Sequence, residues 1–146
     1  MAVTTQIAEP FLLGLLVQAG RHAQNAAEAV LATHGLRYDL WAVLDLLRRR
    51  GTCAMAEIAD DVVIPPPTLT RAVDKLIADG LVHRLSDPAD RRRVLARLTR
   101  RGERLHEELA STMALAAEAV IVDIGHNERV GIAQALRAVS ATARPA

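Results

Sequence analysis

The chain has few of the residue types on which several classes of function depend. Of its 146 residues, only Phe11, Tyr38 and Trp41 are aromatic. Proteins that recognise single-stranded RNA stack its bases on aromatic rings, so this function is disfavoured. Cys53 is the one cysteine, which excludes an internal disulfide and a cysteine-based zinc cluster.

Motifs of enzymes and of membrane proteins are also missing. The sequence contains no glycine-rich phosphate loop, no nucleophile elbow, and no two histidines spaced three or four residues apart. We therefore expect no enzymatic activity, no metal and no cofactor. The longest apolar run, residues 11–17, is far shorter than the roughly 20 residues of a membrane span. Because the opening MAVTTQIAEP lacks the basic segment of a secretion signal, we expect a cytoplasmic protein without membrane contact.

Positive charge is concentrated in the middle of the chain. The formal net charge is only +1, yet residues 48–104 hold 13 Lys or Arg against 8 Asp or Glu. The remaining residues hold 5 against 9. Six arginines fall within the sixteen residues DPADRRRVLARLTRRG, residues 87–102. A basic middle between acidic ends favours a polyanionic partner for the middle segment.

Apolar residues recur at helical spacing over much of the chain. The spacing predicts a long helix over residues 11–35, a second in RYDLWAVLDLLRRRG, and a short third in AMAEIADDV. Because proline can open a helix but not continue one, a fourth helix is predicted to begin near Pro67 and to end at Gly80. Two short helices in close succession, the second apolar behind and polar in front, are typical of a helix-turn-helix.

Two strands and two further helices are predicted after the helix-turn-helix. LVHRL and RVLARL alternate apolar and polar residues, and turn-forming residues 86–90 lie between them. Thr99 is expected to cap a helix that runs toward Ile124, and Asn127 to cap a last helix after Gly125. The expected fold is mainly α with a small β-hairpin wing, a winged helix-turn-helix flanked by N- and C-terminal helices.

Two stretches carry a family pattern. Residues 90–99, DRRRVLARLT, match the spacing D-x-R-x-x-x-x-x-L-T, and a glycine follows at position 102. Together with TLTRAVDKLIADGLVHR, residues 68–84, and the order of the predicted elements, this pattern resembles the MarR family (multiple antibiotic resistance regulators) of winged-helix transcription factors. Pro65-Pro66-Pro67 departs from the family, where a single proline or small polar residues are more usual.

The resemblance implies three regions and a second copy of the chain. Residues 1–35 would form an N-terminal dimerisation helix, residues 36–99 the DNA-binding lobe, and residues 100–146 the C-terminal dimerisation helices. A homodimer would place two recognition helices one DNA turn apart, about 34–36 Å, on a near-palindromic operator in double-stranded DNA. The alternative is an intramolecular bundle of the same helices.

Nine residues are expected to contact DNA. The first turns of a recognition helix lead into the major groove, and the residues expected there are Pro67, Thr68, Thr70, Arg71 and Lys75. Arginine suits guanine, whereas lysine suits phosphate. At the hairpin tip we expect Asp90, Arg91, Arg92 and Arg93, because narrow minor grooves attract arginine. The resemblance implies that Arg92 enters or follows the minor groove and that Asp90 pairs with an arginine. A solvated surface is the alternative for each position.

Control by a small ligand is a further implication of the resemblance. Many relatives respond to small apolar or phenolic molecules bound between the dimer helices and the DNA-binding lobe. Cys53 could sense oxidants, but no basic residue stands directly beside it, which favours a buried structural cysteine. We therefore expect a sequence-specific DNA-binding transcriptional regulator, a homodimeric repressor released by a ligand. The alternative is a helical protein-interaction adaptor, which would leave the arginine-rich hairpin unused.

Overall fold

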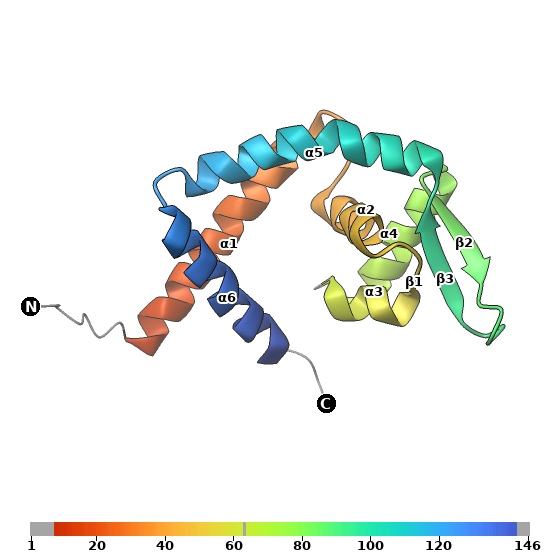
Figure 1. Cartoon of the computed structure of the whole chain (residues 1–146), viewed down its shortest axis with the longest axis horizontal. Coiled ribbons are helices and arrows are strands. Elements are labelled where there is room, and N and C mark those ends of the chain that lie inside the picture. Colours follow the sequence, from red (N-terminus) through yellow and green to blue (C-terminus); the bar gives the residue numbers. More distant parts are fainter. Residues whose placement is uncertain (1–7, 63, 143–146) are drawn as a thin grey trace, which may run out of the picture.

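A computed structural model describes residues 8–62 and 64–142. These residues form helices and short strands in the order α1 (Glu9–Ala32), α2 (Tyr38–Arg50), β1 (Cys53–Ala54), α3 (Met55–Asp61), α4 (Pro66–Ala78), β2 (Val82–Ser86), β3 (Val94–Leu98), α5 (Arg100–Ile121) and α6 (His126–Thr142). Figure 1 shows a lobe of shorter helices and a protruding hairpin, with α5 running from that lobe across to α6. The predicted helical fold with a small wing is confirmed.

One hydrophobic core holds the lobe together and extends into the long helices. Its fully buried side chains come from α1 through α5. They are Leu31, Val43, Leu44, Leu47, Ile58, Leu76 and Leu109. Burying one such side chain contributes about 1.5–3 kcal/mol. Because Leu31 belongs to α1 and Leu109 to α5, both long helices are anchored in the same core as the helix-turn-helix.

A three-stranded antiparallel sheet in the order β1-β3-β2 closes the lobe. The hairpin register pairs Val82 with Leu98 and Ser86 with Val94. On the other side of β3, Cys53 pairs with Ala96. The sequence analysis did not predict β1, because two residues are too few to show an alternating pattern. This short strand fixes the hairpin against the start of α3.

Several helix ends differ from those predicted. α1 ends at Ala32, and Gly35 lies beyond it in a turn with φ of +65°. α4 begins at Pro66, one residue before the predicted start. α6 begins at His126, so Asn127 lies inside its first turn and does not cap it. The side chain of Glu128 instead accepts a hydrogen bond from the Gly125 N–H at 2.8 Å.

Thr99 caps α5 as predicted. Its Oγ1 accepts a hydrogen bond from the Gly102 N–H at 3.0 Å and donates one to the Gly80 carbonyl at 2.7 Å. A threonine cap contributes about 1 kcal/mol to helix stability. Here the same hydroxyl also fixes the start of α5 against the turn that follows α4.

Large apolar side chains remain exposed on the long helices. Those of α1, of the C-terminal part of α5 and of α6 include Phe11, Leu13, Val17, Leu115, Val130 and Leu136. No single helix in the described part of the chain is both long and apolar enough to cross a bilayer. Only α5 and α6 taken together meet that length and composition, and they bend by 101° where they join.

Candidate nucleic-acid interface

Helix α4, the second helix of the helix-turn-helix, buries one face and exposes the other. Leu69, Ala72, Val73 and Leu76 pack into the core. Thr70, Arg71 and Lys75 are exposed, and Thr68 is half-buried. This division follows the 3.6-residue period of the helix. Of the predicted major-groove residues, all but Thr68 therefore lie fully on the solvent side.

The triple proline forms the start of α4. Pro65 occupies the N-cap position, and Pro66 and Pro67 are the first two helical residues. Helices tolerate proline there because the first N–H groups have no partner within the helix. Both Pro66 and Pro67 are exposed. The tip of this helix therefore presents apolar carbon atoms in place of amide donors.

The polar side chains of α4 differ in the contacts that they form within the chain. Thr70 Oγ1 donates to the Pro66 carbonyl at 3.1 Å. Lys75 Nζ forms an ion pair with Asp79 at 2.9 Å. Asp74 lies 3.8 Å from Arg84 of β2, which links this helix to the wing. Within the described part of the chain Arg71 forms no ion pair, so its guanidinium remains available for an external acceptor.

Two aspartates shape the tip of the wing through backbone hydrogen bonds. Asp87 Oδ1 accepts from the Ala89 N–H at 2.9 Å, and Asp90 Oδ1 accepts from the Arg92 N–H at 3.0 Å. Such local side-chain acceptors stabilise turns. Asp90 thus contacts an arginine as expected, but through the Arg92 backbone, and it forms no ion pair with an arginine side chain in the described part of the chain. A carboxylate this close in sequence satisfies the nearest unpaired N–H group instead.

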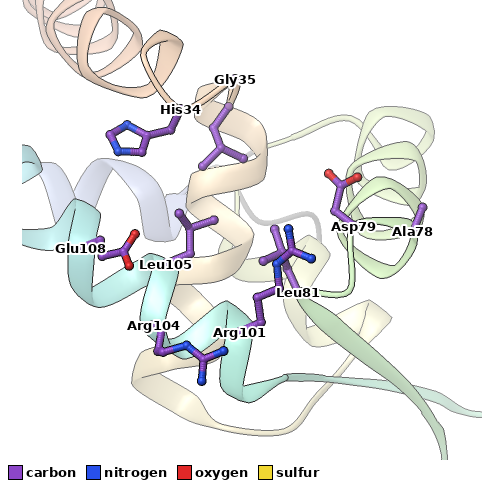
Figure 2. A pocket seen from close by; sticks show the side chains of 10 residues that line it. His34, Gly35, Ala78, Asp79, Leu81, Arg101, Arg104, Leu105 and Glu108 are labelled. Carbon is purple, nitrogen blue, oxygen red and sulfur yellow. The ribbon is translucent and has the colours of Figure 1, made fainter.

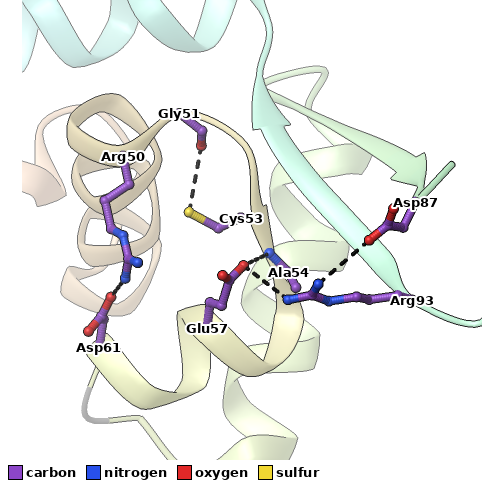
Figure 3. Close-up of polar contacts among 8 residues, drawn as sticks. All are labelled: Arg50, Gly51, Cys53, Ala54, Glu57, Asp61, Asp87 and Arg93. Carbon is purple, nitrogen blue, oxygen red and sulfur yellow. Dashed lines mark hydrogen bonds and ion pairs between the residues drawn. The ribbon is translucent and has the colours of Figure 1, made fainter. Parts of the chain in front are cut away.

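Arg93 has a structural position that the sequence analysis missed. Its guanidinium lies 3.6 Å from Asp87 in the wing and 3.6 Å from Glu57 of α3. Glu57 also accepts a hydrogen bond from the Ala54 N–H at 2.6 Å, which caps α3. Figure 3 shows this chain of contacts running from the wing to α3. Arg93 thus braces the wing, just after its tip, against the helix-turn-helix.

Arg91 and Arg92 are exposed at the tip. In the described part of the chain neither side chain forms an ion pair, unlike that of Arg93. Two unpaired guanidiniums at the end of a braced hairpin form a concentrated positive site that is available to an external anion. Together with Arg71 on α4 and Arg97 on β3, they make four arginines without an ion pair in the described part of residues 36–99.

Cys53 is buried, as the sequence analysis favoured. Its Sγ donates a weak hydrogen bond to the Gly51 carbonyl at 3.7 Å, seen in Figure 3. Burial raises the pKa of the thiol, although the nearby Arg50 partly opposes this shift. A thiol in this environment is protonated at neutral pH and is a poor nucleophile.

A cavity of about 420 Å³ lies between α1, α2 and the segment that leads into α4. Its lining includes Tyr38 and Trp41, two of the three aromatic residues, together with Asp45, Ile64 and Pro65. Cavities of this size accept small organic molecules. The sequence analysis could not place such a cavity, because its walls come from segments far apart in the chain. In the described part of the chain, no three His, Cys, Asp or Glu side chains are grouped to hold a metal ion.

Comparison with known proteins decides the family. The MarR family model matches residues 37–94. The chain is 33% identical to the HTH-type transcriptional regulator FarR of Neisseria gonorrhoeae over 94 residues, 64% of each chain. It is 27% identical to the HTH-type transcriptional regulator MhqR of Bacillus subtilis over 89% of this chain and 90% of MhqR. Residues 37–94 therefore form a MarR-family domain.

A solved structure extends this likeness to the whole fold. The solved structure of BpsR from Bordetella bronchiseptica is reported with a mechanism by which 6-hydroxynicotinic acid regulates the DNA binding of that protein. It superposes on this chain with a TM-score of 0.80 at 28% identity. The match covers 88% of this chain and 98% of BpsR. The chain spans slightly less than two thirds of FarR but nearly all of MhqR. These relatives are named as regulators, not as enzymes.

Proposed function

We propose that this MarR-family chain binds double-stranded operator DNA as a homodimer and represses transcription of nearby genes. The observation that carries the proposal is the pair of unpaired arginines, Arg91 and Arg92, at the tip of a hairpin braced by Arg93. Minor grooves that are narrow carry a strong negative potential and attract such side chains. A protein-interaction adaptor would have no use for two unpaired arginines at the end of such a hairpin.

In the major groove, α4 supplies the contacts. Arg71 has the geometry to read a guanine through two hydrogen bonds, an interaction that discriminates by about 1–3 kcal/mol. Thr68 and Thr70 flank it, and Pro67 offers its carbon atoms to a thymine methyl group. Lys75, held by Asp79, binds phosphate after giving up that ion pair. Asp90 acts indirectly, because it positions the Arg92 backbone.

The exposed apolar side chains of α1, α5 and α6 form the dimer contact in this proposal. Residues 1–35 and 100–146 are the dimerisation regions, and residues 36–99 form the DNA-binding lobe. An apolar surface of this kind on a folded chain marks an interaction site. A two-fold pair would place both α4 helices on one face of the DNA and would favour a near-palindromic operator.

The 420 Å³ cavity is our proposed site for a small aromatic inducer, such as a phenol. Trp41 and Tyr38 supply aromatic walls, and the lining residues Ile64 and Pro65 lead directly into α4. A ligand that binds better when α4 is displaced from its DNA-bound position would lower DNA affinity by the same factor that DNA lowers ligand affinity.

The experiment measures fluorescence anisotropy of the chain on duplex DNA from its own upstream region and on a scrambled duplex. It compares the unmodified protein, Arg92→Ala and the control Arg97→Ala at several salt concentrations. Arg97 lies near the base of the same hairpin. We expect selective, salt-sensitive binding that weakens in Arg92→Ala, with the logarithmic salt slope reduced by about one. Equal binding by Arg92→Ala and the unmodified protein, or no selectivity between the duplexes, would favour the adaptor alternative.

A further inference from the structure

The hairpin of the wing has one face toward the core and one face away from it. Val82 and Leu98 pair across the hairpin and are both buried. Because successive residues of a strand point to opposite faces, the next pair, His83 and Arg97, points away from the core, and both residues are exposed. The residue after His83, Arg84, points the other way and forms an ion pair with α4. We call the face with His83 and Arg97 the outer face; the sheet itself separates it from α4.

An open hollow of about 740 Å³ lies where the outer face meets the start of α5. Its lining includes His83 and Arg97 of the hairpin and Arg100 and Arg101 of α5. In the described part of the chain none of these three arginines forms an ion pair. Glu103 is the one carboxylate among the described residues that line the hollow. The hollow therefore has an excess of positive charge.

Hydrogen bonds fix the backbone around the hollow. Thr99 and Gly80 both line it, and Thr99 Oγ1 donates to the Gly80 carbonyl at 2.7 Å. The Thr99 N–H also donates to the Leu81 carbonyl, at 3.0 Å. Arg97 and Arg100 stand two residues before and one residue after Thr99. Their backbone positions are thus set before any partner binds, which lowers the cost of ordering the site on binding.

Arg101 stands at the edge of the hollow. It also lines a neighbouring groove, shown in Figure 2, where its side chain reaches toward Leu81 and Asp79. Neither Arg97 nor Arg100 lines that groove. A partner seated in the hollow therefore meets Arg97 and Arg100 first.

An apolar pair continues the outer face toward the tip of the wing. Leu85 and Leu95 are opposite each other in the hairpin register, two residues along each strand from His83 and Arg97. This separation is about 7 Å. Both leucines are half-buried, so part of each side chain remains accessible. A phosphate backbone would place charged groups over them, whereas a polypeptide can cover them with an apolar side chain and gain from their burial.

We propose that the outer face and its hollow dock an acidic, partly apolar segment of another protein. The carboxylates of that segment lie against Arg97 and Arg100, and an apolar side chain covers Leu85 and Leu95. Arginine suits this role because its planar fork can donate two parallel hydrogen bonds to a carboxylate. A duplex held by the exposed side of α4 and by the tip of the wing leaves the outer face open. The partner protein can therefore bind this chain while the chain is on DNA.

This docking step goes beyond operator binding and needs no DNA, so it can be tested by itself. It also requires that the outer face contribute nothing to operator affinity. Arg97→Ala, the control variant of the DNA experiment, should therefore bind the upstream duplex as the unmodified protein does.

The test is fluorescence anisotropy of the full chain with the rhodamine-labelled peptide EEDEGLL and with its uncharged analogue QQNQGLL. The variants are Arg100→Gln and the double variant Arg97→Gln/Arg100→Gln. The matched control is Arg91→Gln, since Arg91 is another exposed arginine without an ion pair in the described part of the chain, at the tip of the same hairpin.

We expect the acidic peptide to bind more tightly than its analogue. Arg100→Gln should weaken its binding about threefold and the double variant about tenfold, the usual range for exposed ion pairs. Arg91→Gln should leave peptide binding unchanged and weaken DNA binding, whereas the double variant should do the reverse. Addition of the upstream duplex should not displace the peptide.

Several results would overturn the proposal. They are no binding of EEDEGLL at millimolar concentration, equal affinity for QQNQGLL, or the same loss in Arg91→Gln as in the double variant, which would show that only the net charge matters. Displacement of the peptide by the duplex, with weaker DNA binding of the double variant, would assign the outer face to DNA instead. If the peptide results hold while the chain shows no selectivity between the duplexes, the operator-binding proposal alone fails.

Discussion

The imidazole ring of His106 in α5 lies flat against the indole ring of Trp41 in α2, with ring centroids 4.8 Å apart and planes 5° from parallel. His106 Nε2 is also 3.0 Å from Asp45 Oδ1. The second carboxylate oxygen of Asp45 accepts from Arg49 Nε at 3.0 Å. This buried contact joins the long helix α5 to the helix-turn-helix lobe. Because Trp41 and Asp45 also line the 420 Å³ cavity, the joint lies directly beside the proposed inducer site.

Replacing His106 with alanine should destabilise the protein. The change removes a stacked ring and one hydrogen bond from a buried position, and we expect the free energy of unfolding to fall by about 2–3 kcal/mol. Urea denaturation at one fixed protein concentration measures this. His83→Ala, at an exposed position on β2, is the control and should change stability by less than about 0.5 kcal/mol. Similar losses of unfolding free energy in both variants would show that the contacts of His106 do not stabilise the fold.

Gly102 should not tolerate any side chain. A Cβ atom at this position in α5 would lie 2.2 Å from the Leu81 carbonyl oxygen, a backbone atom that cannot move aside. Gly102→Ala should therefore lower the free energy of unfolding by about 1–3 kcal/mol, the usual cost of overpacking. Gly131→Ala in α6 is the matched control, since nothing lies within 4 Å of its Cβ position. That variant should gain about 0.5–1 kcal/mol from better helix propensity. Equal melting temperatures for the two variants would contradict the close contact.

Arg92 and Arg93 should differ although they are adjacent. Arg93→Ala removes the brace to Asp87 and Glu57, so the amide hydrogens of the tip should exchange faster with solvent. Arg92→Ala should leave exchange unchanged and affect only DNA binding. Hydrogen–deuterium exchange of the DNA-free protein, followed by mass spectrometry, compares the two. Faster exchange in both variants, or in neither, would contradict the bracing role of Arg93.

The sequence predicted the elements of this fold far better than the contacts between them. The helices and the wing are visible because apolar spacing and the Asp90–Thr99 pattern are local signals. The stack of His106 on Trp41 is not, because 65 positions separate the two residues in the chain. Nothing in the local pattern distinguishes His106 from the four other histidines.

Contacts at the tip of the wing were also not predicted correctly, although the residues involved are close in the chain. An aspartate beside three arginines suggested an ion pair, but backbone N–H groups at a tight turn compete for its carboxylate and are closer. The brace at Arg93 depends on Glu57, which only the pairing of β1 with β3 brings near. The 420 Å³ cavity was beyond prediction for a similar reason, since it is lined by segments distant in the sequence.

Low pH should reduce the local stability of the junction between α5 and α6. Arg129 donates two hydrogen bonds to the Glu118 carboxylate, at 2.7 and 2.8 Å, and these lower the pKa of Glu118. A carboxyl group whose pKa is lower in the folded state stabilises the fold above its unfolded pKa. That contribution is lost as the pH falls through the lowered folded value. Exchange of α6 amides should therefore rise in acid, corrected for intrinsic rates, and Glu118→Gln should remove this extra pH dependence. The same pH dependence of exchange in Glu118→Gln would show that other carboxylates determine the stability of this junction in acid.

Cys53 should be inert in the folded protein. Burial raises the pKa of its thiol, so the thiolate that reacts with alkylating agents and peroxides is scarce at neutral pH. We expect iodoacetamide to modify it slowly in buffer and rapidly in urea, as measured by intact-mass spectrometry. Peroxide at concentrations that oxidise exposed thiols should leave DNA binding unchanged. Cys53→Ala keeps a small apolar residue at the site and should respond to peroxide as the unmodified protein does. A loss of DNA binding in the unmodified protein alone would show instead that this cysteine senses oxidants despite its burial.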